Sequence, residues 1–200
     1  MELSYIVTCT DNDKTIKDIL LSYFKISHRL LTTLKKNNCI YLNNSSAFVY
    51  KKLKQGDILS VSFNYEEDNS NIVPNEIPLD IIYEDDWYLV INKPSGIPVH
   101  PSILHYEDSL SNGIKFYFDK IGLKKKIRPV NRIDKDTSGL VVFAKNEYIQ
   151  ECLIQQMKSN DFKKEYIAFV ENHFDFDKKK RNYKFTYFKK RKQYYRKMYR

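Results

Sequence analysis

The chain has 200 residues, 42% of them hydrophobic, which suffices for one medium domain or two small ones. Its three widely spaced cysteines include no Cys-x-x-Cys pair, and its four histidines lack metal-ligand spacing, so neither a disulfide scaffold nor a zinc cluster is expected. There is no basic-then-apolar leader and no apolar run near 18 residues, so we expect a cytoplasmic monomer without a membrane span or a metal.

The formal net charge of +9 is confined to one end of the chain. Residues 178–200 contain 12 Lys and Arg and neither Asp nor Glu, whereas the other 177 residues carry 22 Lys and Arg against 25 Asp and Glu. A basic chain is typical of nucleic-acid-binding proteins. Because the excess lies in the last 23 residues, it is weak evidence about what the rest of the protein binds.

Residues 1–63 read as a short strand, two short helices and three further short strands. A strand is expected at 3–8, and Asp11 or Asp13 is expected to cap the helix that follows. The apolar side of that helix has regular helical spacing and comprises Ile16, Ile19, Leu20, Tyr23 and Phe24. Strands are then expected at 40–42, 47–51 and 58–63.

A second helix is expected to begin after Ser27, which suits an N-cap. Its apolar positions Leu30, Leu31 and Leu34 should face inward, and its basic positions Arg29, Lys35 and Lys36 outward. The basic side chains are compatible with RNA phosphates, whose counterions they would release, or with an ordinary solvated helix face.

Residues 64–77 are polar, acidic and interrupted by proline, which predicts a linker. A second domain should then open with residues 81–86 and a strand at 87–92, followed by an extended, proline-stiffened loop at 93–101. Within that loop, His100 taken alone is more readily a packed histidine than a catalyst, and we expect the loop to support an active site. The elements expected next are a helix at 108–122, a strand at 128–131, a strand at 140–144, a helix at 147–157 and a strand at 164–170.

The stretch Arg132–Leu140 carries most of the chemical information. Its Asp, Thr, Ser and Gly residues favour a tight turn, and the apolar run that follows predicts a buried strand. Asp134 should therefore sit on a rigid loop at the mouth of a sheet, two residues from Arg132. Read without further context, Asp134 and Asp136 are turn formers, whereas a carboxylate placed there also suits nucleophilic or electrostatic work.

Arg132-Ile133-Asp134 and the residues through Lys145 resemble the signature of the RluA family of RNA pseudouridine synthases. The resemblance implies that Asp134 is catalytic and that Arg132 contacts the substrate. It also matches the Lys-Pro loop to the family's first motif and Tyr166, in Lys164-Glu165-Tyr166, to the tyrosine that packs on the target base. Two departures are visible: Asn131 stands where the family has His, and Ile133 where it has Leu.

Residues 11–63 resemble the small S4-type RNA-binding module in their order of helices and strands. That resemblance implies that Arg29, Lys35 and Lys36 contact RNA phosphates. The predicted fold is thus α+β, with an S4-type module at 1–63, a linker at 64–77, and an incomplete catalytic domain at 78–177 on a mixed, mainly antiparallel sheet.

After Val170 the resemblance fades, and after Lys180 it ends. Residues 178–200 interleave basic and aromatic side chains, which suits an RNA-binding tail. The abrupt change follows three consecutive lysines, whose codons can form a slippage site. We therefore interpret the tail as the non-native product of a frameshift that truncates the catalytic domain, a reading that sequencing the gene across Lys178–Lys180 tests.

The sequence thus predicts an RNA pseudouridine synthase that acts on ribosomal RNA, with transfer RNA as the alternative. Isomerising uridine adds no atom and exchanges no electrons with a partner, so no cofactor is expected. Two further hypotheses stay open: a catalytically inactive, truncated RNA-binding protein, and a basic-tailed RNA-binding protein without chemistry.

Overall fold

A computed structural model describes residues 1–167, 184–190 and 193–199. The chain divides into two compact units, Met1–Lys163 and Lys164–Arg200. The described residues form helices and antiparallel sheets, so the α+β class is confirmed. No helix among them is long and apolar enough to cross a membrane.

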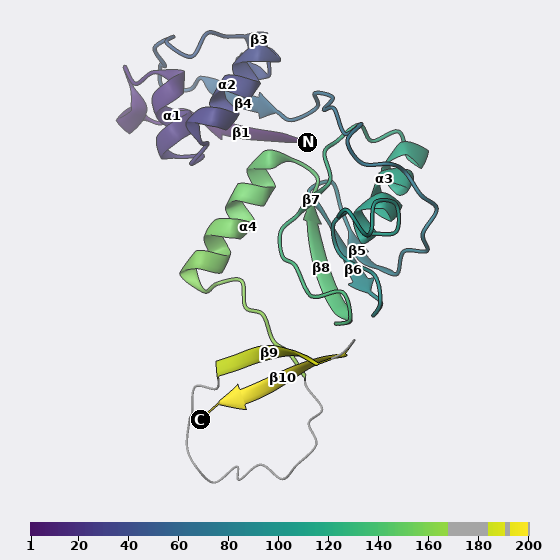
Figure 1. Ribbon diagram of the computed structural model, residues 1–200. Helices are drawn as coiled ribbons and strands as arrows, with labels where there is room; N and C mark the ends of the chain where they lie inside the picture. The colour runs from purple at the N-terminus through teal and green to yellow at the C-terminus, as the bar shows by residue number, and fades with distance from the viewer. Residues whose placement is uncertain (168–183, 191–192, 200) are drawn as a thin grey trace. The chain divides into compact units, whose positions relative to one another are not determined.

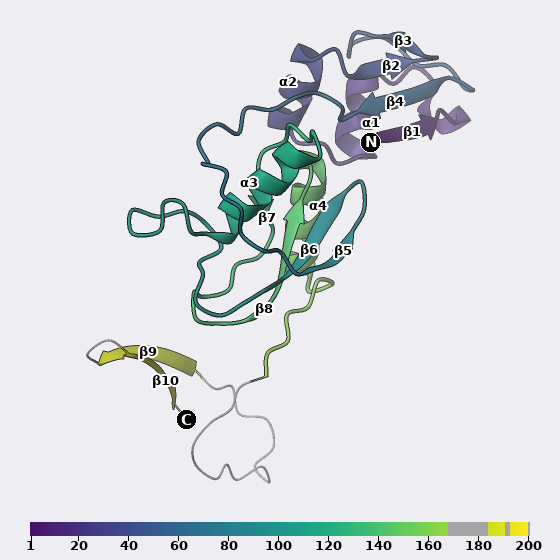
Figure 2. The same cartoon turned by 90° about the vertical axis from the view of Figure 1, so that its right-hand side faces the viewer.

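The N-terminal part of the first unit is a four-stranded antiparallel sheet with two helices (Figures 1 and 2). Its strand order is β1-β4-β2-β3. The elements are β1 (Glu2–Ile6), the 3-10 helix η1 (Cys9–Asp11), α1 (Ile16–Ser22), α2 (His28–Lys36), β2 (Ile40–Leu42), β3 (Ser45–Ser46) and β4 (Ile58–Ser62). Buried side chains of the two helices, α1 and α2, and of the strands β2 and β4 share one hydrophobic core.

The cap of α1 differs from the prediction, which placed it at Asp11 or Asp13. Thr15 is the N-cap: its hydroxyl accepts a hydrogen bond from the Asp18 amide, and the Asp18 carboxylate accepts one from the Thr15 amide at 2.8 Å. This reciprocal pair satisfies two backbone donors that would otherwise lack partners. Asp11 instead accepts hydrogen bonds from Lys14, Thr8 and Tyr5, which hold its pKa far below the usual value.

The predictions for α2 are confirmed. Ser27 is its N-cap and accepts a hydrogen bond from the Leu30 amide at 3.2 Å. The three leucines are buried, and the three basic side chains are exposed. The strand expected at 47–51 is wrong: β3 is confined to Ser45–Ser46, and the chain then turns, with the Lys51 amide donating to the Phe48 carbonyl at 3.0 Å.

The rest of the first unit contains a second antiparallel sheet in the order β5-β6-β8-β7 (Figures 1 and 2). Its elements are β5 (Ile81–Glu84), β6 (Tyr88–Lys93), α3 (Leu110–Lys120), β7 (Arg128–Pro129), β8 (Gly139–Ala144) and α4 (Glu147–Ser159). The central strands β6 and β8 pair from Tyr88 opposite Ala144 to Lys93 opposite Gly139. Apolar side chains of β6, β8 and α3 form a second core.

In the second unit, the backbone of β9 (Lys184–Lys190) pairs antiparallel with β10 (Gln193–Tyr199). The strand expected at 164–170 is wrong for 164–167, which adopt neither helix nor strand, and its last three residues lie outside the described part of the chain. The proposed frameshift after Lys180 also falls outside it and stays a prediction.

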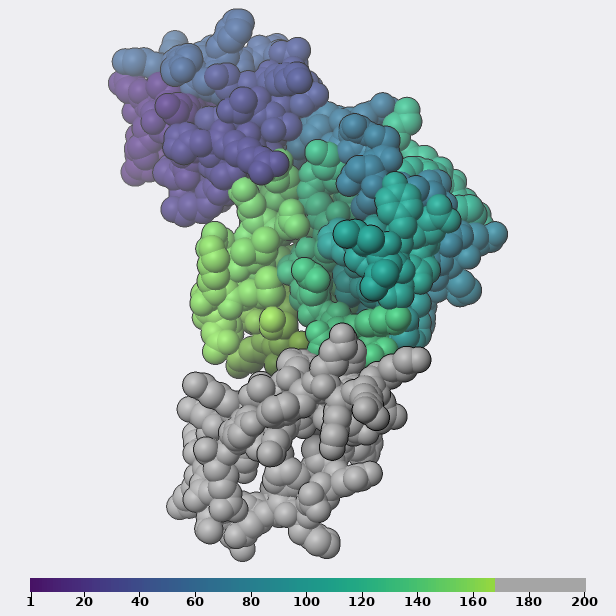
Figure 3. Space-filling view, in the orientation of Figure 1, coloured from purple at the N-terminus to yellow at the C-terminus, as the bar shows by residue number. Residues whose placement is uncertain are grey.

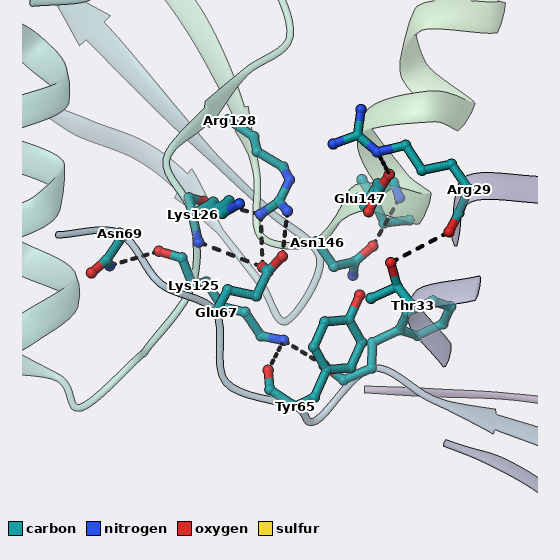
Figure 4. A network of polar contacts seen from close by, with 12 residues as sticks. Arg29, Thr33, Tyr65, Glu67, Asn69, Lys125, Lys126, Arg128, Asn146 and Glu147 are labelled. Atoms are coloured by element: carbon teal, nitrogen blue, oxygen red, sulfur yellow. Dashed lines mark hydrogen bonds and ion pairs between the residues drawn. The ribbon is translucent and has the colours of Figure 1, made fainter. Parts of the chain in front are cut away.

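Residues 64–77 form neither helix nor strand, in keeping with a connection, but part of this segment is firmly fastened (Figure 4). The buried ammonium of Lys125 donates to the carbonyls of Phe63 (2.6 Å) and Tyr65 (2.5 Å) and lies 4.3 Å from the centre of the Tyr65 ring. Beside it, Arg128 and Glu67 form a bidentate ion pair whose side chains are about nine-tenths buried.

We expect Glu67→Gln to destabilise the protein by about 3–5 kcal/mol, because it leaves the Arg128 guanidinium buried without its counter-charge. Urea unfolding followed by circular dichroism would measure the change. Glu66→Gln is the matched control: Glu66 pairs with Lys124 at the surface, with side chains 72% and 67% exposed, so its loss should matter by at most about 1 kcal/mol. Equal losses of stability in Glu67→Gln and Glu66→Gln would contradict the conclusion that Glu67 is the counter-charge of a buried Arg128.

Candidate active site

A buried lysine joins two loops at one end of the second sheet. Lys93, the last residue of β6, is 0% exposed, and its ammonium donates hydrogen bonds of 2.8 Å each to the carbonyls of Pro94, Ile97 and Lys135. Burial lowers the pKa of Lys93, and the negative charges of Asp136 and Asp134 oppose that shift. One side chain thus fixes both the loop after β6 and the loop before β8.

Further bonds tie the same two loops together. The Gly96 amide donates to the Lys135 carbonyl at 2.9 Å, and the Ser95 hydroxyl donates to the Asp136 carbonyl at 2.8 Å. Gly96 has a φ of +94°, a conformation that favours glycine. The expectation that the Lys-Pro loop supports the Asp134 loop therefore agrees with the contacts.

Asn131 fixes the start of the second loop. Its side-chain oxygen accepts from the Val142 amide (2.8 Å), and its nitrogen donates to the Leu140 carbonyl (3.0 Å). The amide thus imitates a paired strand residue and holds the chain against β8 just before Arg132. At the position where this sequence departs from the family pattern, the substituted side chain is buried and fully engaged in structure.

The two loops enclose a pocket of about 540 Å³, lined by residues 98–102 and 132–135. Arg132 and Asp134 both line it, and both side chains are exposed. A volume of this size lies in the range of about 300–1,000 Å³ typical of small-ligand sites. The pocket therefore offers a carboxylate and a guanidinium to a molecule the size of a nucleoside.

His100 lies in the pocket wall, half-buried, with Nδ1 3.2 Å from the Ser111 hydroxyl oxygen. Because that hydroxyl donates to the Val99 carbonyl at 2.7 Å, its oxygen is free to accept from Nδ1–H of His100. Burial lowers the pKa of His100, and the nearby charge of Arg132 lowers it further. The ring is thus a neutral wall of the pocket at neutral pH.

The lowered pKa of His100 predicts a loss of stability in mild acid. Between the ordinary histidine pKa of about 6.5 and the lower folded value, the unfolded chain binds more protons, so the free energy of unfolding should fall as pH drops from about 7 to 5. His100→Gln should flatten this part of the curve, measured by urea unfolding at several pH values. An unchanged slope in the variant would show that His100 does not contribute.

The sequence-predicted residues fall into three places. Arg132 and Asp134 share the pocket; Arg29, Lys35 and Lys36 lie exposed on α2, where the Arg29 Nε is 3.4 Å from the Glu147 carboxylate. Tyr166 belongs to the second unit and is 58% exposed. The roles of all six stay predictions.

Sequence reasoning assigned no contact to Lys93 or Ser111, and it noted Asn131 only as a departure from the family pattern. The motif contained Lys93, but only the fold shows that its ammonium reaches three carbonyls. Within the described residues, no group of three or more His, Cys, Asp or Glu side chains is arranged to hold a metal.

Comparison with known proteins agrees with this geometry. The sequence model of the family described as RNA pseudouridylate synthase matches residues 87–200, more than half of the chain. The chain therefore belongs to the RNA pseudouridylate synthase family.

Curated relatives carry names from the same class. The uncharacterized RNA pseudouridine synthase YjbO of Bacillus subtilis is 36% identical over 72% of this chain and 52% of its own length. Proteins named ribosomal large subunit pseudouridine synthase D are 32% identical in Neisseria meningitidis serogroup B (84% of this chain, 44% of the relative) and 35% identical in Borreliella burgdorferi (76% and 47%). The chain spans about half the length of these relatives.

Proposed function

We propose that this protein isomerises uridine to pseudouridine in structured RNA and that Asp134 is its catalytic residue. The observation that carries the proposal is the placement of Asp134 beside Arg132 in an open pocket of nucleoside size, on a loop fastened by the Lys93 ammonium. Family membership supplies the reaction class.

The reaction breaks the N1–C1′ bond of uridine and joins C5 to C1′. C5 gives up its proton to solvent and N1 takes up a proton, so the product has the same atoms in number and kind as uridine. A carboxylate beside the ribose or the base either attacks covalently or stabilises a charged intermediate. The target nucleotide must first leave its stack, a step that takes a few kcal/mol. We assign Arg132 to the phosphate near the vacated position and Tyr166 to packing on the flipped base.

We further propose ribosomal RNA as the substrate, with residues 1–63 acting as an S4-type RNA-binding module. The relatives named ribosomal large subunit pseudouridine synthase D support this choice. The RNA-binding role of residues 1–63 is supported by the three basic side chains of α2, which are exposed and can therefore reach RNA phosphates.

The test of the reaction is release of tritium from RNA that carries [5-³H]uridine. We expect the protein to release tritium from ribosomal RNA transcripts, because C5 loses its hydrogen when it bonds to C1′. RNA binding without release would favour an inactive RNA-binding protein. Release from transfer RNA alone would leave the reaction standing and overturn the ribosomal substrate.

The role of α2 has its own prediction. Replacing Lys35 and Lys36 with Ala should weaken RNA binding and reduce the slope of log affinity against log salt by about 0.7–0.9 for each lost phosphate contact. Fluorescence anisotropy over a salt series measures both quantities. The exposed pair Lys120→Ala and Lys124→Ala removes the same charge elsewhere and serves as control; equal losses from both pairs would mean that α2 is not the contact surface.

A further inference from the structure

Two large aromatic side chains stand exposed on the N-terminal part of the protein. Phe48 is 88% exposed and Tyr50 71% exposed, while Val49 between them and Leu53 beyond them are buried. Their segment runs along the upper edge of the N-terminal part in Figure 1, and Figure 3 shows this edge in space-filling form. Burial of Val49 directs the neighbouring rings to solvent.

The backbone that carries the two rings is held on both sides. The Ala47 amide donates to the Ile40 carbonyl at 3.0 Å, and the Lys17 amide donates to the Val49 carbonyl at 2.9 Å. A turn bond from the Lys51 amide to the Phe48 carbonyl closes the segment. A ligand that met these rings would find their backbone already fixed, so the entropy lost on binding would be mainly that of the two side chains.

The rings border a small hollow of about 200 Å³ that is also lined by Lys35 of α2. This volume is below the range of about 300–1,000 Å³ usual for sites that enclose a small molecule. It suits planar groups laid against the surface, with a cation at the border.

The excess of positive charge in the part of the chain that forms the hollow favours a negatively charged partner. Residues 19–56 contain seven Lys and Arg and neither Asp nor Glu, although acidic residues outnumber basic ones over residues 1–177 as a whole. Lys52 is paired at 3.9 Å with Asp13, which lies outside this stretch. A lysine-rich stretch of chain that lacks Asp and Glu and exposes two aromatic rings combines the two features by which proteins hold single-stranded nucleic acid.

We propose that Phe48 and Tyr50 form a stacking site for unpaired bases of RNA, with Lys35 contacting the adjoining phosphate. The inference rests on the proposed function only in taking RNA as the ligand, and it adds a base-contacting site on the N-terminal part, distinct from the pocket that holds Asp134. Stacking tolerates any sequence because every base has a π face. The site would therefore hold a flanking single strand rather than choose the target.

The test compares two labelled single strands of equal length, oligouridylate and the same backbone without bases, by fluorescence anisotropy. The protein should bind the oligouridylate more tightly, and the double variant Phe48→Ala/Tyr50→Ala should weaken that binding by about 5- to 150-fold per stacked base. Binding of the abasic strand, and the salt dependence of oligouridylate binding, should not change, because no charge is removed.

The swapped variant Phe48→Tyr/Tyr50→Phe keeps both rings and should bind as the original protein does. Thermal unfolding of the alanine variant, whose substitutions are at the surface, should be unchanged. The inference is overturned if the alanine variant retains its affinity for oligouridylate, which is the result expected if the rings served a protein partner. It is also overturned if the variant loses equal affinity for both strands. Tritium release is scored separately: absence of release with ring-dependent binding would sink the proposed reaction and leave the stacking site standing.

Discussion

Asp134→Asn should lower tritium release from [5-³H]uridine RNA by at least about 10²-fold. The amide occupies nearly the same volume as the carboxylate, but it carries no charge and is a far poorer nucleophile. Removing a single group that acts covalently in an active site lowers rates by about 10⁴- to 10⁶-fold, and removing an electrostatic stabiliser by about 10²- to 10³-fold. Asp134 lines the pocket and is exposed, so stability should change by less than about 1 kcal/mol.

Asp136→Asn is the matched control for this prediction. Asp136 lies in the same loop, is exposed like Asp134, and does not line the pocket, and its substitution removes the same unit of charge. It should keep release within a few-fold of the original rate, and both variants should bind RNA with similar affinity. A variant at Asp134 that still releases tritium at a comparable rate would exclude a catalytic role for this carboxylate.

The strand and the loop that carry Asp134 could be predicted from the sequence, because the patterns that indicate them involve only neighbouring residues. The run Leu140–Ala144 has the apolar character of a buried strand, and the turn residues before it place Asp134 on a loop. Ser27 at an N-cap and the leucine spacing of α2 likewise depend on residues within one or two turns of each other. These features could be read without knowledge of distant contacts.

The features that could not be predicted from the sequence depend on contacts between distant residues, or on a choice between several residues that are equally suited to the same role. Thr15, and not Asp11 or Asp13, is the N-cap of α1, because Asp18 exchanges two hydrogen bonds with it. The segment 47–51 has the composition of a strand, but it turns after Ser46 and bonds to Lys17 in another element.

Lys93 illustrates the same limit within the site. Nothing near it in the chain reveals that its ammonium reaches the carbonyl of Lys135, 42 residues away. The family pattern indicated that the Lys-Pro loop supports the active site, whereas the way in which it does so follows only from the fold. The three carbonyl acceptors compensate for the desolvation of the ammonium, so a charged residue can end a central strand here.

Lys93→Met should lower both stability and activity. Methionine has a similar apolar stem to lysine but donates no hydrogen bond. The carbonyls of Pro94 and Ile97 therefore lose this donor, whereas that of Lys135 keeps the Gly96 amide. Each buried acceptor left without a partner costs about 1–3 kcal/mol, partly offset because the ammonium no longer has to be desolvated. We expect a net loss of about 2–4 kcal/mol, measured by urea unfolding.

The effect on activity should exceed what unfolding explains. Without the ammonium, the loop that carries Arg132 and Asp134 loses one of its ties to the loop after β6, and a displacement of about 1 Å at a reacting group can lower a rate by about 10²-fold. Tritium release per folded molecule should fall by about that factor at a temperature where both proteins are folded. Lys93→Arg should not restore it, because a planar guanidinium cannot point at three carbonyls arranged around an ammonium.

Lys145→Met separates positioning from stability. Lys145 is another buried lysine. It lies at the opposite end of the β6–β8 pair, where its ammonium donates to the Asp85 carbonyl and lies 2.8 Å from the Glu84 carboxylate. Its loss should also destabilise the protein, because it removes a buried charge from its partners, yet it leaves the loops around the pocket tied. If Lys145→Met lowers release per folded molecule as much as Lys93→Met does, the Lys93 ammonium serves the fold alone and has no particular part in placing Asp134.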